Sequence, residues 1–213
     1  VLLGDYVFAM SATFVCDTGN IGVIRRFSET IMELASGELM EQFSAYNWQL
    51  TRTEYEKRIY NKTASLFSTA TESGAVLSGA PTAETEALKN YGYHLGMSFQ
   101  IMDDILDFQG TEEELGKPVG NDLLQGTITL PVLLLIQEYP KEKIFQRLLE
   151  GKEDDRDLRK VIDMVRNSNA LETALQVTSE YQGNALSELS KLRDVRGRKS
   201  LEVLTEYVSH RRT

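Results

Sequence analysis

The stretch FQIMDDILDF, residues Phe99 to Phe108, decides how this chain is best interpreted. On an α-helix each residue turns about 100°, so with Asp103 at zero Asp107 lies at roughly 40° and Asp104 at roughly 100°. Gln100, at roughly 60°, falls inside the same sector. Apolar residues border this sector, with Phe99, Met102 and Leu106 on one side and Ile101, Ile105 and Phe108 on the other. Because a solvated charged face normally lies opposite a single apolar stripe, we expect these carboxylates to face a cavity.

Three carboxylates in a partly dry space raise one another's pKa unless a cation neutralises them. Mg²⁺ binds through one or two carboxylates and keeps waters and substrate phosphates as its other ligands. The sequence therefore predicts that Asp103, Asp104 and Asp107 hold Mg²⁺ for a phosphorylated substrate. The alternative is a solvated acidic helix turn without a ligand.

Composition narrows the function further. The 213 residues can form one sizeable core, and we expect one all-α domain over residues 1–213. The net charge of −9, with no basic tract, argues against a nucleic-acid partner. The single cysteine, Cys16, fits the reducing cytoplasm and is expected to be a small packing residue. The longest apolar run, Leu130 to Ile136, is too short to cross a bilayer.

Apolar periodicity and turn residues predict the helices. The expected ranges are 1–17, 21–47, 53–78, 82–109, 132–138, 154–167, 169–192 and 197–210. Thr53 with Glu56 is expected to form the capping box of the third helix, and Asn169 with Glu172 is a further helix-start signal. Residues 110–126, with several glycines, form the longest irregular segment, a loop that could close over a charged ligand. The chain opens inside a helical pattern, so we expect it to be part of a longer one.

The third helix carries a lysine in its apolar face. That face is expected to comprise Tyr55, Ile59, Thr63, Leu66, Ala70, Gly74 and Leu77. Lys62 on it needs an anionic partner or must extend to solvent, and a carboxylate or a substrate phosphate would serve. Lys117, in the glycine-rich loop, either contacts phosphate or is solvated. Glu38, Glu41 and Gln42 could support a metal site or be surface residues. His94 points away from the aspartate sector, so a structural role is expected.

Four ordered motifs resemble those of the trans-type polyprenyl diphosphate synthases, the farnesyl and geranylgeranyl synthase group. They are Asn61–Phe67, Tyr91–Gln100, Asp103-Asp104-x-x-Asp107, and Gly116–Leu123 followed by Thr129-Leu130-Pro131. The resemblance implies an all-α isoprenoid-synthase-type helical bundle around a central cavity, here without its N-terminal helices, and a homodimer.

The resemblance also implies roles for individual residues. Asp103, Asp104 and Asp107 would hold Mg²⁺ that bridges an allylic diphosphate. Lys62 and Lys117 would contact this diphosphate. Thr63 and Gln100 would present oxygen dipoles to the allylic cation, which isopentenyl diphosphate then attacks.

Departures from the family pattern matter. The first aspartate-rich motif, the Arg-Arg pair after it and the Gly-Lys-Arg segment are absent and would lie before Val1. This chain alone is therefore expected to be inactive or nearly so. Thr127 stands where farnesyl-type members often carry lysine, which favours a medium- or long-chain synthase. A class I terpene cyclase is one alternative, although the Gly-Lys-Pro loop argues against it. A non-catalytic synthase subunit is another, although the intact aspartates argue against that.

Overall fold

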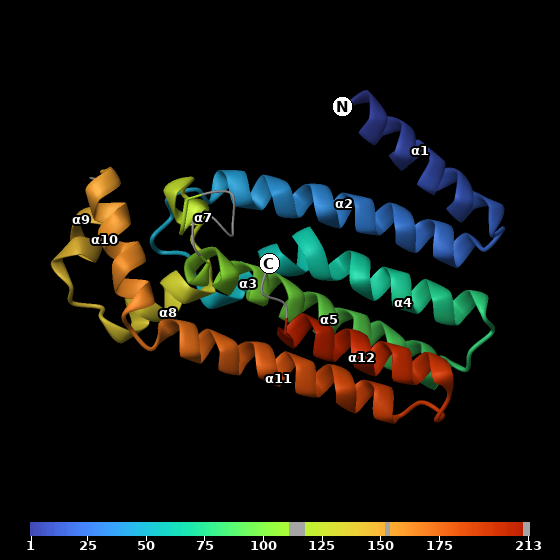
Figure 1. Ribbon diagram of the computed structural model, residues 1–213. Helices are drawn as coiled ribbons and strands as arrows, with labels where there is room; N and C mark the ends of the chain where they lie inside the picture. Colours follow the sequence, from blue (N-terminus) through green and yellow to red (C-terminus); the bar gives the residue numbers. More distant parts are fainter. Residues whose placement is uncertain (111–117, 152–153, 211–213) are drawn as a thin grey trace.

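The computed structural model describes residues 1–110, 118–151 and 154–210, and all regular structure in them is helical (Figure 1). The elements are α1 (Leu2–Asp17), α2 (Ile21–Phe43), α3 (Arg52–Ile59), the π-helix η1 (Tyr60–Ala64), α4 (Ser65–Leu77), α5 (Thr82–Gln109), α7 (Asn121–Leu124), α8 (Leu130–Glu138), α9 (Lys143–Leu149), α10 (Asp155–Arg166), α11 (Ala170–Ser190) and α12 (Arg196–His210). The long helices α2, α4, α5 and α11 lie side by side, and α7 to α10 gather at one end. The predicted all-α class is confirmed.

Helix α5 is the central element and has the bounds predicted from the sequence. It packs most extensively against α4 and α11. Two glycines one turn apart, Gly92 and Gly96, allow α4 and the end of η1 to approach closely. A Cβ atom on Gly96 would lie 2.6 Å from the Cα atom of Ala64, so no other residue fits there without moving the two backbones.

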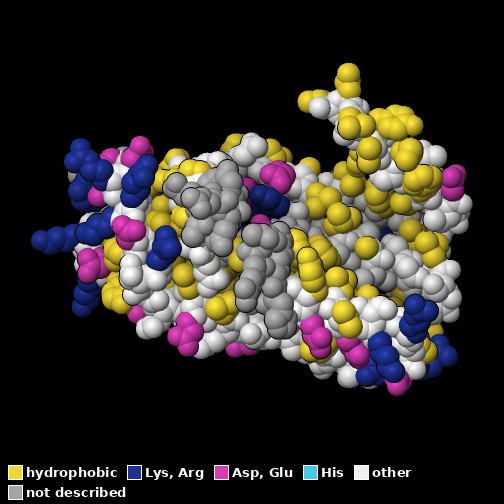
Figure 2. Space-filling view, in the orientation of Figure 1, with side chains coloured by type: hydrophobic (Ala, Val, Ile, Leu, Met, Phe, Trp, Pro, Cys, Tyr) yellow, Lys and Arg dark blue, Asp and Glu magenta, His cyan; other side chains and the backbone are white. Residues whose placement is uncertain are grey.

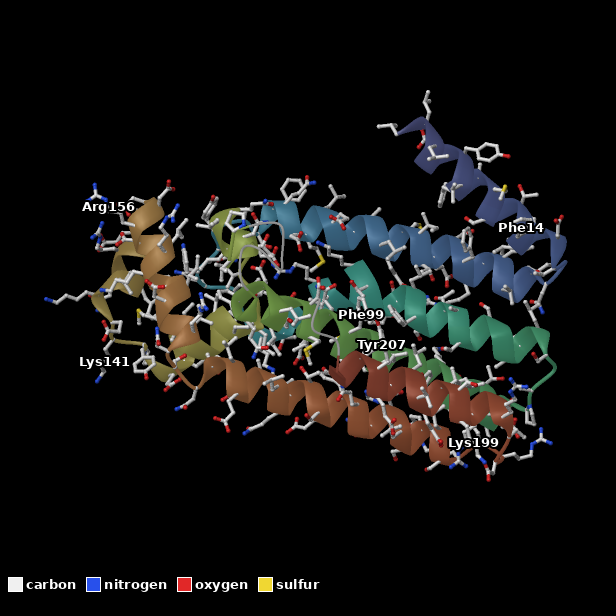
Figure 3. All side chains as sticks on the ribbon, viewed as in Figure 1. Phe14, Phe99, Lys141, Arg156, Lys199 and Tyr207 are labelled. Carbon is white, nitrogen blue, oxygen red and sulfur yellow. The ribbon has the colours of Figure 1, made fainter. Side chains whose placement is uncertain are left out.

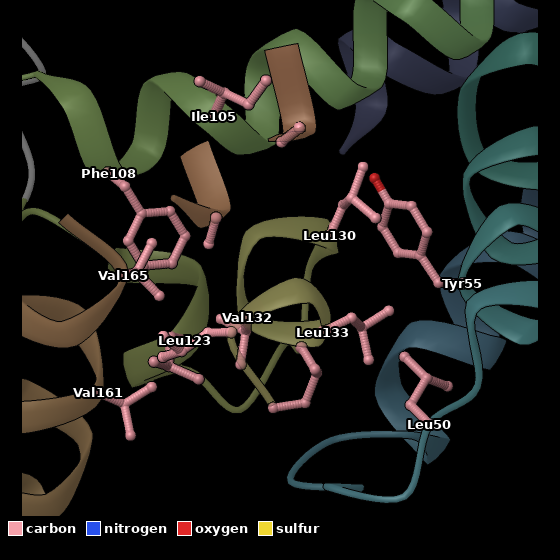
Figure 4. Packing of buried hydrophobic residues seen from close by; sticks show 14 of the residues in the cluster. Leu50, Tyr55, Ile105, Phe108, Leu123, Leu130, Val132, Leu133, Val161 and Val165 are labelled. Atoms are coloured by element: carbon pink, nitrogen blue, oxygen red, sulfur yellow. The ribbon is translucent and has the colours of Figure 1, made fainter. Parts of the chain in front are cut away.

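The main core surrounds α8 at the crowded end of the bundle. Figure 4 shows Leu130 of α8 beside Tyr55 of α3, and Phe108 of α5 beside Val165 of α10. The apolar residues predicted to flank the aspartates on α5 are buried, apart from the partly buried Phe99. The motif therefore lies on a helix that is largely buried around it.

Helix α1 stands apart from this core. It has no buried residue and packs on α2. Its apolar side chains gather on the arm that projects from the molecule in Figure 2, and Phe14, labelled in Figure 3, is 62% exposed. The prediction that Cys16 is a packing residue is wrong, because Cys16 is exposed on this arm.

The third predicted helix starts elsewhere than expected. Thr51 and Glu54 form the capping box, not Thr53 and Glu56. The Thr51 hydroxyl accepts from the Glu54 amide, while the Glu56 carboxylate instead accepts from Arg52 Nε at 2.9 Å. Two overlapping capping patterns occur in the sequence, and the turn after α2 selects the first.

The same helix is interrupted by η1, which changes its buried face. The predicted face is correct for Tyr55 and Ile59, but Leu66, Ala70, Gly74 and Leu77 are exposed. Ser65, Ser68, Thr69 and Ala75 are buried in their place. A π-turn takes up one residue more than an α-turn, so α4 is rotated by about 100° relative to a straight continuation of α3.

Smaller differences concern the ends of elements. Helix α2 stops at Phe43, four residues earlier than predicted, and α9 was not predicted because seven residues carry too short a pattern. Asn169 is the N-cap of α11, but its side chain makes no capping hydrogen bond. No helix among the described residues combines the length and apolar character that a bilayer crossing needs.

Candidate functional site

A cavity of about 140 Å³ lies where α2, α3, η1, α5 and the segment after α7 meet. It is lined by Glu41, Arg58, Ile59, Lys62, Gln100, Asp103, Asp104, Asp122, Thr127 and Thr129. The described part of its lining carries four carboxylates and two basic groups. The larger apolar groove by Leu39 and Phe43 has only Glu54 and Arg58 as charged residues in its described lining.

The three aspartates of α5 occupy different environments. Asp103 is exposed and lines the cavity, whereas Asp104 lines it while only 3% exposed. Asp107 is 2% exposed and does not line the cavity. Its Oδ2 atom accepts a hydrogen bond from the Asp122 amide at 3.1 Å, so it anchors the start of α7 to α5.

A chain of hydrogen bonds runs through the cavity wall. The Thr63 hydroxyl donates to Gln100 Oε1 at 2.6 Å, and Gln100 Nε2 donates to Asp104 Oδ1 at 3.0 Å. The Tyr55 hydroxyl donates to Asp104 Oδ2 at 2.7 Å. Both Asp104 oxygens therefore accept protein donors, and the Gln100 amide is fixed with its oxygen towards Thr63.

Burial controls the charge of Asp104. Loss of solvent raises the pKa of its carboxyl to about 7, and the charge of Asp122 acts in the same direction. The hydrogen bonds from Tyr55 and Gln100 oppose this, as does the charge of Arg58. Burial beside this carboxylate also raises the pKa of Tyr55 well above its ordinary value, so Tyr55 stays a hydrogen-bond donor at neutral pH.

Lys62 meets a carboxylate across the cavity. Its Nζ atom donates to Glu41 Oε1 at 2.6 Å, and Glu38 is farther away at 3.8 Å with a more exposed side chain. Burial alone would lower the pKa of Lys62, but the hydrogen bond and charge of Glu41 raise it overall. The lysine is therefore fully protonated and held at the cavity by an acid from α2.

The π-turn places two side chains, Tyr55 and Thr63, on the same face towards α5. Tyr55 and Thr63 are eight residues apart, which places them roughly 80° apart on a straight α-helix. When η1 absorbs one residue, this difference falls to roughly 20°, and both side chains face α5. Helix α2 supports the turn closely, because a Cβ atom on Gly37 would lie 2.5 Å from the Lys62 amide nitrogen.

The structure adds residues to those singled out in the sequence. Asp122 and Arg58 line the cavity, and Arg58 carried the same signal as Lys62, a basic residue within an apolar face. Lys117, predicted to contact phosphate, lies outside the described residues. His94 does not line the cavity and packs between Tyr93 and Tyr181, as a structural role requires.

The lining suits a hard divalent cation. Carboxylate oxygens are the ligands that Mg²⁺ and Ca²⁺ prefer. Among the described residues, no three acids or histidines already surround one point. Mg²⁺ requires only one or two carboxylates when phosphate oxygens complete its shell, so Asp103 and a neighbour on the cavity wall fit this role.

Comparison with known proteins identifies the family. A family model described as Polyprenyl synthetase matches residues 1–165. The chain belongs to this family. A polyprenyl synthetase relative, heptaprenyl diphosphate synthase component 2 of Bacillus subtilis (strain 168), is 38% identical over 209 residues, which cover 98% of this chain and 60% of the relative.

Solved polyprenyl synthetase structures share the whole described fold. Heptaprenyl diphosphate synthase from Staphylococcus aureus has a TM-score of 0.94 and 35% identity, over 100% of this chain and 67% of that one. A polyprenyl synthase from Caulobacter crescentus CB15, complexed with calcium and isoprenyl diphosphate, has a TM-score of 0.89 and 32% identity, over 100% of this chain and 66% of that one. The chain spans about half to two thirds of the length of the curated relatives it matches.

Proposed function

We propose that the protein is a Mg²⁺-dependent prenyltransferase that joins isopentenyl diphosphate to an allylic diphosphate and so extends a polyprenyl chain. The observation that carries this proposal is that Lys62, Gln100, Asp103 and Asp104 line one cavity in a polyprenyl synthetase chain. The relative complexed with calcium and isoprenyl diphosphate supports a divalent metal and a prenyl diphosphate ligand.

Asp103, Asp104 and Asp107 would serve the metal in different ways. Asp103 is exposed to the cavity and would be a direct ligand. Asp104 and Asp107 are buried and hydrogen-bonded, so they would orient the site and add negative charge behind it. When bound, Mg²⁺ would stabilise the negative charge that develops on the departing diphosphate.

Lys62 and Lys117 would bind the diphosphate. Lys62 is already charged and partly desolvated, so a phosphate oxygen could replace or join Glu41 as its acceptor. Thr63 and Gln100 would direct oxygen dipoles towards the allylic cation, and their mutual hydrogen bond fixes those dipoles beforehand. The apolar surroundings would exclude water that could quench the cation.

We also propose that the protein is a cytoplasmic homodimer. The support is helix α1, whose large apolar side chains, including Tyr6 and Phe14, are exposed on one helix. Exposed apolar surface of this kind marks a protein interface, and a second copy would cover it. Sedimentation of the complete protein measures its oligomeric state directly.

The test uses the complete protein encoded by its gene. It is incubated with an allylic diphosphate and labelled isopentenyl diphosphate, with Mg²⁺ or with a chelator. We expect chain extension only with Mg²⁺, and a loss of turnover of about 100-fold or more in Asp103→Ala with little change in melting temperature. Asp163→Ala, an exposed aspartate on α10, is the matched control.

Two outcomes would contradict the proposal. Product formed without isopentenyl diphosphate would indicate cyclase chemistry instead. The other outcome is that Asp103→Ala loses turnover only because less of the protein is folded, while the specific activity of the folded fraction is unchanged. Asp103 would then have no role in the site.

A further inference from the structure

Arg58 lies behind the cavity and ties three segments together. It is 2% exposed, its Nη2 atom donates to the Ile128 carbonyl at 2.5 Å, and its Nη1 atom donates to the Ser44 hydroxyl at 3.3 Å. Its guanidinium carbon lies 5.6 Å from the centre of the Tyr55 ring. One side chain therefore links the end of α2, helix α3 and the segment that enters α8.

The environment of Arg58 is unusual for a buried arginine. Within the described part of the chain no carboxylate lies at ion-pair distance from Arg58, whereas Arg26 has three such partners and Arg147 has one. Its Nε atom is buried without a hydrogen-bond partner. The charge of Arg58 acts on the buried carboxyl of Asp104 without a direct ion pair between the two groups. A buried charge without a direct ion pair costs stability, so packing alone does not account for Arg58. Arg58 lies between the charged cavity and the apolar groove beside α2, and it lines both.

The segment that Arg58 holds is also fixed two residues earlier, at Gly126. The Tyr46 amide donates to the Gly126 carbonyl at 2.8 Å, and the Tyr46 ring covers Gly126, where a Cβ atom would lie 2.7 Å from that ring. Gly126 has a φ of 88°, which favours glycine, and Tyr46 itself has a φ of 57°. Non-glycine residues persist in that region only when their surroundings impose it.

This segment supplies one wall of the cavity. Thr127 and Thr129 line it directly, and the Thr127 amide donates to the backbone carbonyl of Asp122 at 2.8 Å. Any movement of Ile128 would therefore move Thr127 and Asp122 relative to Asp103 across the cavity.

We propose that Arg58 is a positioning residue of this site, which holds the wall formed by residues 122–129 at the correct distance from the aspartates of α5. The hydrogen bond to the Ile128 carbonyl transmits this effect, which requires no contact between Arg58 and the substrate. The inference rests on the proposed function and adds a residue to which none of the four family-like motifs assigns a role.

The test compares Arg58→Met and Arg58→Lys with Arg52→Met, a control on the same helix whose arginine is half exposed and paired with Glu56. Binding of inorganic pyrophosphate with Mg²⁺ is measured by calorimetry in the complete protein. We expect Arg58→Met to weaken binding by about tenfold or more, as for other residues that orient metal ligands. Arg58→Lys keeps a donor for Ile128 and is expected to stay within about threefold of the unmodified protein.

Two results would overturn the proposal. One is Arg58→Met binding pyrophosphate as well as Arg52→Met does, even if its melting temperature falls, since Arg58 would then be structural only. The other is Arg58→Lys binding no better than Arg58→Met. If Arg58→Met does not fold, Ser44→Ala replaces it, and unchanged amide exchange at residues 125–129 relative to Arg52→Met would overturn the proposal.

Amide exchange also separates this inference from the proposed function. If the unmodified protein fails to bind pyrophosphate, the proposed function is wrong. Faster exchange at residues 125–129 in Arg58→Met, but not in Arg58→Lys or Arg52→Met, would still show that Arg58 positions this wall.

Discussion

Replacing Gly96 with alanine tests the packing on which the site depends. An added Cβ atom would lie 2.6 Å from the Cα atom and 2.9 Å from the Cβ atom of Ala64, against about 3.5–4.0 Å for an ordinary carbon contact. The end of η1 and helix α5 must therefore separate by about 1 Å, because a backbone atom cannot rotate away. Overpacking of this kind costs about 1–3 kcal/mol, and the close backbone contact places Gly96→Ala near the upper value.

The matched control is Gly74→Ala on α4, where an added Cβ atom meets nothing within 4 Å. Alanine is favoured over glycine in a helix by about 0.5–1 kcal/mol, so this variant should gain stability. Gly96→Ala receives the same helix-propensity gain, so this gain cancels when the two variants are compared. We therefore expect their free energies of unfolding to differ by the overpacking cost, about 2–3 kcal/mol.

Urea unfolding followed by circular dichroism measures this difference, with the slope checked for constancy. Gly96 precedes Gln100 by one helical turn and packs against the residue after Thr63, so the hydrogen bond between Thr63 and Gln100 should also lengthen. If the proposed function is correct, turnover of the complete protein should then fall. If Gly96→Ala is stabilised as much as Gly74→Ala, the close approach of the two helices is not a feature of the folded protein.

Two further predictions concern charge and helix capping. In metal-free protein, the free energy of unfolding of Asp104→Asn relative to the unmodified protein should rise by on the order of 4 kcal/mol between pH 4 and pH 8. Because burial raises the pKa of Asp104 to about 7, the folded protein holds one more proton than the unfolded protein between about pH 4 and pH 7. The stability of the unmodified protein therefore falls as the pH rises through that window. Urea unfolding with a chelator measures the stability of both proteins against pH, and parallel profiles would disprove this. Thr51→Ala should cost about 1 kcal/mol by removing the cap of α3, and Thr53→Ala less than about 0.5 kcal/mol. Thermal unfolding compares them, and equal losses would argue against the observed capping box.

The sequence predicts some elements well because their signals are local. Helix α5 has Pro81 before it, Gly110 after it and apolar residues on both sides of its acidic sector, and its bounds were correct. The start of α3 was wrong by two residues because Thr51-x-x-Glu54 and Thr53-x-x-Glu56 both satisfy the same pattern. Only the preceding turn, which is fixed by tertiary contacts, distinguishes them.

In the site, too, local features were predicted and contacts between elements were not. Helical angles placed Gln100, Asp103 and Asp104 in one sector, and all three line the cavity. The angles could not show that Asp107 is turned towards α7, because that contact involves another element. Nor could they show which acid pairs with Lys62, since Glu41 lies on a separate helix. The metal and substrate roles of these residues stay predictions.

The π-turn η1 has a consequence for how this gene can change. Loss of a single codon within residues 60–64 would join α3 and α4 into one regular helix. That helix would still be capped at Thr51 and would still have an apolar side. The tyrosine and the threonine that now reach the same partner helix would then point in different directions. A homologue that is one residue shorter between those two positions can therefore keep the architecture while other side chains face α5 at the candidate site.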